Sequence, residues 1–272
     1  MIENPSPAQV TRRSWLALPL ALMALPHATA WAQASGPAPA PAPVLALGVF
    51  ALLGESLQLV FPADVTDTRL DRNLRETLPI KDIGFDEAAL RAVSAVAGRQ
   101  RPAARLQMFR ATRTIEPAEQ RAVADGATRA ELPDWIVKTI QSANLSHLLL
   151  ITRHRGEASF PLLNGFSIGR GKVEGIGYCV DNSTEIKNFS TGKASTGFLG
   201  AFVMLRLQLM DAQSGQILGS QDVRVGEIHA GRNDTETANI WNALSPREKV
   251  DVLRRLVEQN VARVLPAVLG KG

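Results

Sequence analysis

Two glycine–lysine steps come closest in this sequence to a loop that could cradle a phosphate. The first is GRGK at residues 169–172, and a second Gly-Lys step stands at 192–193. A P-loop needs a glycine five residues before the glycine of such a step and a serine or threonine after the lysine. The first step has Phe166 and Val173 there, the second also lacks the leading glycine, and Glu174 breaks a Gly-x-Gly-x-x-Gly pattern. We expect no nucleotide site, and we expect these glycines in turns, bulges or close packing.

The histidines and the single cysteine form no recognisable catalytic or metal-binding pattern. His147 and His154 are seven positions apart along an apparent strand, so their side chains should point to opposite faces and share no metal. His229 stands alone, and no Gly-x-Ser-x-Gly or His-Glu-x-x-His motif accompanies it. Cys179 lies in a strand-like run and is expected to be a buried, unreactive thiol. We therefore predict no catalytic residue, no metal ligand, no cofactor and no enzymatic activity.

Two tryptophans lie beyond the amino-terminal segment and could anchor a partner. Trp135 lies on the apolar face of a predicted helix, which favours a place in the core. Trp241 precedes the last helix in a polar stretch, where it could either staple onto that helix or stay exposed as a binding anchor.

Hydrophobic periodicity predicts the elements that must position these side chains. Apolar runs at residues 44–53 and 56–61, separated by Gly54 and Glu55, predict a β-hairpin at the start of the domain. Residues 82–98 follow with helical spacing, and Gly98 is placed to end the helix.

A helix and a buried strand form the next predicted unit. Residues 105–112 read as a strand, and residues 133–144 place apolar side chains on one face of a helix. The continuous apolar run at 146–152 is typical of a strand covered on both faces. This unit predicts a layered α+β fold, with helices packed on a mixed sheet.

The last part of the domain combines a glycine-rich stretch, a hairpin and a helix. Residues 161–200 are rich in Gly, Ser, Asn and Thr and are expected to be a looped insertion around one strand. Residues 198–210 and 216–228 read as two long strands joined by a turn with a glycine. From Ser245, a capping box with proline at the first helical position predicts a carboxy-terminal amphipathic helix.

The amino-terminal residues 1–32 are typical of a secretory signal peptide. A basic patch with Arg12 and Arg13 precedes a short apolar run and then small residues. That run is about half the ~20 residues that a helix needs to cross a bilayer. TRRSWL is similar to the twin-arginine export signal, and a general secretory signal fits equally well. Cleavage can follow one of three alanines, of which we favour the second: Ala30, Ala32 and Ala34.

The remaining composition limits the partners that the mature chain can have. Residues 33–43 are rich in proline and alanine, which alternate from Pro37 to Pro43, and predict an extended spacer. Residues 44–272 are long enough for a single domain. The net charge of the full sequence is only +4 and the basic residues form no run with interleaved aromatics, so we expect no nucleic acid partner. Cys179 is the only cysteine and lies far from the cleavage region, so neither a lipid anchor nor an internal disulfide is expected.

The carboxy-terminal half carries a motif that resembles a known group of domains. The sequences SHLLLITRHRG and LRLQLMDAQSGQILGS lie between a predicted helix and the last helix. They match a strand, D-x-x-T/S-G-x-I/V-L, strand pattern at Asp211, Ser214, Gly215, Ile217 and Leu218. This order resembles the anticodon-binding-like domains of bacterial envelope proteins. Those include the lipoproteins that activate penicillin-binding proteins, flagellar outer-membrane accessory proteins, the curli secretion lipoprotein and the amino-terminal domain of TolB.

The resemblance implies an adaptor that docks onto other envelope proteins, with no catalytic residues to carry over. The chain departs from those lipoproteins in lacking a lipidated cysteine and in carrying the insertion at 161–200. We therefore predict an exported, periplasmic, non-enzymatic accessory or adaptor protein of the bacterial cell envelope. The alternative is a periplasmic small-ligand-binding protein whose insertion closes as a lid, and a hydrolase comes third.

Overall fold

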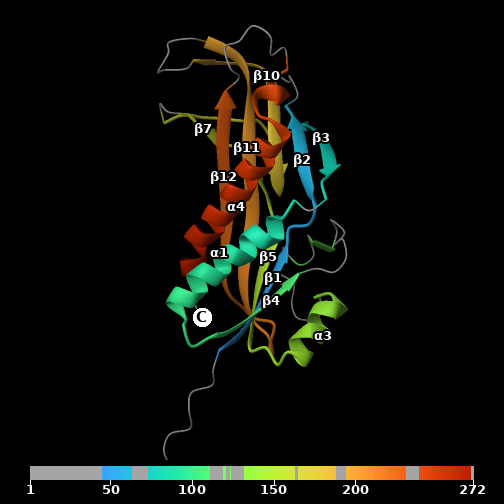
Figure 1. Cartoon of the computed structure of the whole chain (residues 1–272), viewed down its shortest axis with the longest axis vertical. Helices are drawn as coiled ribbons and strands as arrows, with labels where there is room; N and C mark the ends of the chain where they lie inside the picture. The colour runs from blue at the N-terminus through green and yellow to red at the C-terminus, as the bar shows by residue number, and fades with distance from the viewer. Residues whose placement is uncertain are drawn as a thin grey trace, which may run out of the picture. The chain divides into compact units, whose positions relative to one another are not determined.

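A mixed sheet of eight strands organises the protein, seen in a computed structural model (Figure 1). The structure describes residues 45–62, 73–81, 83–110, 119–120, 123, 132–162, 165–187, 194–230 and 239–270. The strands of this sheet, in chain order, are β1 (Ala46–Leu52), β2 (Ser56–Phe61), β3 (Leu74–Pro79), β4 (Arg105–Arg110), β5 (His147–Arg153), β10 (Ile176–Lys187), β11 (Ala194–Asp211) and β12 (Ile217–Ala230). Their spatial order is β3-β2-β10-β11-β5-β1-β4, and β12 pairs with β11. The predicted fold class, a mixed sheet with helices packed on it, is confirmed.

Two helices cover one face of this sheet, as Figure 1 shows, and enclose the main core. They are α1 (Phe85–Gln100) and α4 (Pro246–Leu269). The predicted capping box is present, because the Ser245 hydroxyl accepts from the Glu248 N–H at 3.3 Å and the Glu248 carboxylate accepts from the Ser245 N–H at 2.8 Å. Gly98 does not end α1, which continues to Gln100 and stops just before Pro102.

The other face of the sheet is covered by two separate pieces. Near one end lies α3 (Asp134–Ser142), packed on the apolar side chains of β1 and β5. Toward the other end lie four short strands between β5 and β10, with β7 labelled in Figure 1. They are β6 (Arg155–Glu157), β7 (Phe160–Pro161), β8 (Ser167–Ile168) and β9 (Lys172–Glu174), paired β6 with β9 and β7 with β8. Buried Phe160 packs into this second layer.

The hairpin expected between residues 44–53 and 56–61 is wrong. Both segments are strands, but β1 lies between β4 and β5, and β2 lies between β3 and β10. Since β1 is parallel to β5, β2 is parallel to β10, and both partners are antiparallel to β11, β1 and β2 run in the same direction. Gly54, at φ +71°, bends the chain between them. Arg153 holds this bend by donating from Nε to the Leu53 carbonyl and from Nη2 to the Ser56 carbonyl, both at 2.6 Å.

The looped insertion expected at residues 161–200 is shorter and begins earlier. Residues 176–187 and 194–200 belong to β10 and β11 of the central sheet, and the excursion from the sheet spans residues 154–175. The glycines of the sheet serve close packing rather than mobility: a Cβ on Gly177 would collide with the Gln58 backbone, and one on Gly200 would lie 2.6 Å from the Phe160 ring.

Residues 43–272 form one compact unit. The predicted signal peptide at 1–32 and spacer at 33–43 lie outside the described residues. Within the described part of the chain, no helix is long and apolar enough to cross a membrane.

Candidate binding site

The histidines and the cysteine considered in the sequence do not form one cluster, and the Gly-Lys step at 192–193 lies outside the described residues. His147 begins β5, His154 follows its last residue and His229 lies near the end of β12. Cys179 is buried in β10, as predicted. Among the described residues, no three His, Cys, Asp or Glu side chains are grouped closely enough to hold a metal ion.

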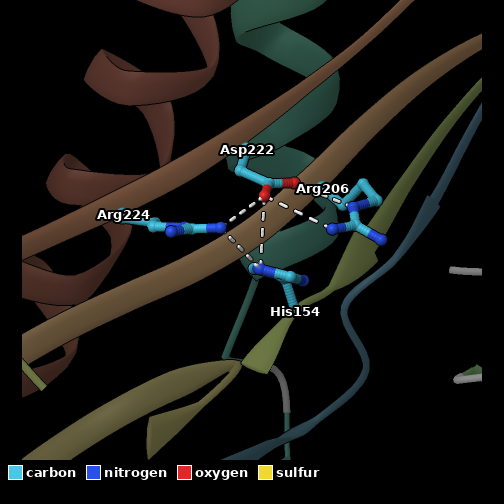
Figure 2. Close-up of polar contacts among 4 residues, drawn as sticks. All are labelled: His154, Arg206, Asp222 and Arg224. Carbon is cyan, nitrogen blue, oxygen red and sulfur yellow. Dashed lines mark hydrogen bonds and ion pairs between the residues drawn. The ribbon is translucent and has the colours of Figure 1, made fainter. Parts of the chain in front are cut away.

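One polar cluster does form, on the sheet face opposite α1 and α4 (Figure 2). Asp222 is its centre. Arg206 donates from Nε to Asp222 Oδ1 at 2.8 Å and from Nη2 to Oδ2 at 3.3 Å, and Arg224 donates from Nη2 to Oδ2 at 2.9 Å. The His154 Nε2 lies 3.3 Å from the same Oδ2 and 3.4 Å from Arg224 Nη2. One carboxylate thus orients two guanidinium groups and an imidazole.

Strand register explains why these four side chains meet. Arg206 on β11 lies opposite Asp222 on β12, and Met204 lies opposite Arg224. Alternate residues of a strand share a face, so Asp222 and Arg224 point to the same side as Arg206. The His154 N–H donates to the Met204 carbonyl at 3.0 Å, which places the imidazole beside the same row.

The electrostatics of the cluster favour a fixed positive charge. Burial by itself would raise the pKa of Asp222, but the hydrogen bonds from Arg206 and Arg224 outweigh burial and hold that pKa below its ordinary value. Arginine stays protonated at any physiological pH. Asp222 therefore remains ionised between two permanent cations, and the excess charge of the cluster is positive.

Buried polar atoms extend this row beneath the cluster. Thr152 lies opposite Arg206 on β5, and Gln208 is the next β11 residue on the same face. Both side chains are fully or almost fully buried, and neither Thr152 Oγ1 nor Gln208 Oε1 has a hydrogen-bond partner. Buried polar atoms without partners are uncommon and usually mark a site for water or another group. The polar row thus interrupts the apolar surface between α3 and the excursion at 154–175.

A hollow of about 490 Å³ opens at this cluster. Its walls carry polar and charged side chains and are largely open to solvent. They are Arg206, Ser220, Gln221, Asp222, Arg224 and Arg263, the last from α4. We call this hollow the cationic concavity. Three guanidinium groups against one carboxylate make it suited to an anionic partner.

A second hollow of about 430 Å³ lies near Trp241, between β2, β10 and the short helix η2 (Ile240–Ala243). The partly buried ring of Trp241 packs edge-on against Tyr178 at 5.8 Å, and Lys249 Nζ of α4 lies 4.3 Å from its centre. Trp241 thus contacts α4, and it also lines this hollow. Trp135, as predicted, packs in the core, 5.7 Å from Phe50.

The sequence predicted none of the arginines or the aspartate of the cationic concavity as a site. The available signal was weak: Arg206 and Gln208 alternate with leucines in an otherwise apolar strand, and Asp222 and Arg224 alternate with apolar residues in the next. Such alternation is the ordinary pattern of a sheet with one solvated face.

No family model matches the chain, and no curated protein matches it. Solved structures align over most of its length. One is described as a putative neuraminyllactose-binding hemagglutinin homolog from Helicobacter pylori. Its sequence is 10% identical, the TM-score is 0.37, and the alignment covers 83% of this chain and 81% of that protein. A Xanthomonas campestris protein of family DUF330 is 11% identical with a TM-score of 0.33, and the alignment covers 87% of this chain and 91% of that protein. A lipoprotein from Neisseria meningitidis is 11% identical with a TM-score of 0.26, and the alignment covers 78% of this chain and 96% of that protein.

Proposed function

We propose that this protein is an exported, non-enzymatic accessory protein of the bacterial cell envelope, and that it docks an acidic surface of another envelope protein in the cationic concavity. The main support is that one carboxylate, Asp222, orients Arg206 and Arg224 in a hollow that is open to solvent. The signal peptide predicted at residues 1–32 supports the assignment to the envelope.

The form of the concavity supports a macromolecular partner rather than a small solute. Sites for small ligands are mostly apolar and enclose most of the ligand surface. This hollow is open, and the side chains of its walls are polar or charged. Arginine is enriched in protein interfaces, where its planar group binds carboxylates with two parallel hydrogen bonds.

The packing of the excursion at residues 154–175 disfavours the alternative, in which that segment closes as a lid. Phe160 is fully buried, and its ring lies against Phe198 at a centroid distance of 5.5 Å. Opening the excursion would expose this ring, at a cost of about 1.5–3 kcal/mol for its apolar surface. The segment therefore acts as a fixed second layer of the sheet.

The chemistry of the cluster supports binding rather than catalysis. Asp222 is ionised and already accepts from two guanidinium groups, and arginine does not exchange protons at neutral pH. These three groups hold fixed charges, which suits the binding of an anionic partner. Turnover of ester, glycoside or phosphate substrates by the purified protein would contradict the proposal.

Site-specific photo-cross-linking in living cells tests the docking surface. A photoreactive residue at Gln221, which lines the concavity, should give an adduct with one reproducible envelope protein. The matched control is the same residue at Ser94, exposed on α1. Arg224→Ala should remove the Gln221 adduct. Equal adducts from both positions, or none under conditions that trap a known periplasmic complex, would overturn the proposal.

Two further measurements separate the remaining alternatives. Osmotic-shock fractionation should recover the chain in the periplasm without its amino-terminal segment, and recovery of the uncleaved chain in the cytoplasm would contradict export. A thermal-shift screen against cell-wall fragments and metabolites tests the ligand-binding alternative, because a ligand at a hundred times its Kd adds about 2.7 kcal/mol of stability. Such a shift that persists in Arg224→Ala would favour that alternative.

A further inference from the structure

We infer that the partner adds an extended acidic segment to the outer edge of β12, as one more strand of the central sheet. This inference rests on the proposed function, because it names how the cationic concavity binds. Among the described strands β12 pairs with β11 alone, so its other edge ends the sheet. An edge strand presents a row of backbone donors and acceptors to any extended chain.

The hydrogen bonds of β11 show which residues of β12 face outward. The Met204 N–H donates to the Gly175 carbonyl at 2.7 Å, and the Met204 carbonyl accepts from the His154 N–H at 3.0 Å. Both backbone groups of Met204 thus point away from β12. Met204 lies opposite Arg224 in an antiparallel pair, so this is a pair without mutual hydrogen bonds, and the backbone groups of Arg224 point to the outer edge.

The same alternation extends along the strand. Asp222 and Ser220 are two and four residues before Arg224, within the same unbroken register. Their N–H and C=O groups therefore also point outward, and Gln221 points inward toward Leu207. Side chains alternate with the same period. The residues whose backbones face outward are thus also those whose side chains line the concavity.

The concavity itself crosses this edge. Ser220, Asp222 and Arg224 line it from one face of β12, whereas Gln221 and Arg263 of α4 line it from the other. A hollow that contacts both faces of one strand must pass over the outer edge of that strand. The edge at residues 220–224 is therefore reachable by another chain.

The charge of the walls selects an acidic segment. On an added strand, alternate side chains would lie beside Asp222 and Arg224, within reach of the guanidinium groups, and the intervening ones would lie on the side of Arg263. Natural edges are commonly protected by lysine or proline. Residues 219–229 of β12 contain neither.

A pair of variants at Ser220 separates strand addition from simple charge attraction. Ser220→Pro removes one outward N–H, a change that an edge strand tolerates. Ser220→Ala is the matched control, because it removes the hydroxyl and keeps the N–H. The probe is a labelled nine-residue peptide that alternates Glu with Val, and its counterpart carries Gln for Glu. Binding to the purified full-length protein is followed by fluorescence anisotropy, after circular dichroism shows that both variants are folded.

The acidic peptide should bind the native protein. It should bind Ser220→Pro roughly tenfold more weakly than Ser220→Ala, as expected when one backbone hydrogen bond is lost, because both variants lack the hydroxyl and only the proline lacks the N–H. Arg224→Ala and the Gln peptide should each weaken binding by a similar factor. Hydrogen exchange on the native protein, which needs no variant, should show slower exchange at the amides of residues 220, 222 and 224 when the acidic peptide is bound.

The failures of the two proposals are distinguishable. Equal binding by Ser220→Pro and Ser220→Ala, with no change in exchange at these amides, would overturn strand addition and leave charge-based docking intact. No acidic peptide binding, with the Gln221 adduct still formed in cells, would also overturn strand addition alone. If the acidic peptide does not bind and the Gln221 adduct does not form either, both proposals are overturned. Binding to phosphatidylglycerol vesicles in place of the peptide would replace the acidic segment with a lipid surface and overturn the inference.

Discussion

Arg206 and Asp222 lie directly opposite each other on β11 and β12, and two hydrogen bonds join them, at 2.8 and 3.3 Å. Their pairing depends on a bulge. Counting outward from the turn, Met210 pairs with Ile217, but the register shifts by one residue before Leu209, which pairs with Gly219. Without this shift Gln221 would lie opposite Arg206, and Asp222 would point to the other face. One irregularity beside the turn thus assembles the cationic concavity.

Asp222→Asn should lower the free energy of unfolding at pH 7 by about 1–2 kcal/mol, because it leaves the partly buried guanidinium group of Arg206 and the exposed one of Arg224 without their counter-charge. Urea denaturation measures the change. Glu157→Gln is the control, since this carboxylate is 74% exposed and lies 3.9 Å from Lys172; it should cost less than about 0.5 kcal/mol. Because the pKa of folded Asp222 is lowered, the difference should be full above the unfolded pKa and should shrink as the pH falls below about 4. An unchanged difference at pH 2.5 would contradict the assignment.

Phe160→Ala should cost about 3–5 kcal/mol of stability, because it opens a cavity beneath the excursion at residues 154–175. The Phe160 ring is fully buried and fills the space above Gly200 and Gly226. Hydrogen exchange should accelerate more at residues 155–174 than in β11. Phe166→Ala is the same chemical change at a ring that is 71% exposed, and it should change stability by less than about 0.5 kcal/mol. Equal effects of the two variants would show that Phe160 does not fasten the excursion.

Local patterns predicted the elements that depend on short stretches of chain. The apolar run of β5 is fully buried from Leu148 to Ile151, as its composition predicted. The turn at 211–215 has Gly215 at φ +76°, and the Ser245 capping box starts α4. In each case neighbouring residues carry the physical cause, so the sequence suffices.

Pairings between distant segments were not predictable in the same way. The β1–β2 hairpin failed because the decisive partner, Arg153, lies about a hundred positions along the chain from the bend that it holds. The glycine-rich stretch was mistaken for a loop because its glycines make room for the Gln58 backbone and the Phe160 ring, both remote in sequence. The site was missed because the bulge that creates it has no clear residue signature.

Cys179 should resist alkylation in the folded protein. Burial raises the pKa of its thiol to about 12, with nearby Asp181 adding to the shift, and the thiolate is the reactive form. Iodoacetamide at pH 8 should leave the native mass unchanged over hours and add one carbamidomethyl group after denaturation in urea. Labelling of the native protein at the rate of a small free thiol would show that β10 opens readily.

Asp86 should make the protein less stable as the pH rises from about 4 to about 6. Burial raises the pKa of this carboxyl to about 6, although the Leu53 N–H, which donates to Oδ1 at 2.8 Å, acts in the opposite direction. In the unfolded chain the carboxyl is solvated and releases its proton near the ordinary aspartate pKa of 3.8. Between these values the folded state binds more protons than the unfolded state, so stability falls with rising pH.

Asp86→Asn keeps an oxygen acceptor for Leu53 and removes the charge, so it should flatten this slope and raise stability at pH 7. The stability of the variant must be subtracted from that of the native protein at each pH. Burial lowers the pKa of His229, so this histidine makes stability rise with pH over an overlapping pH range in both proteins. Denaturation curves from pH 4 to 7.5, with Asp251→Asn at a side chain that is 59% exposed as control, measure it. A native-minus-variant difference that is constant across this range would mean that Asp86 titrates alike in the folded and unfolded chains, and that the carboxylate beside the β1–β2 bend is solvated.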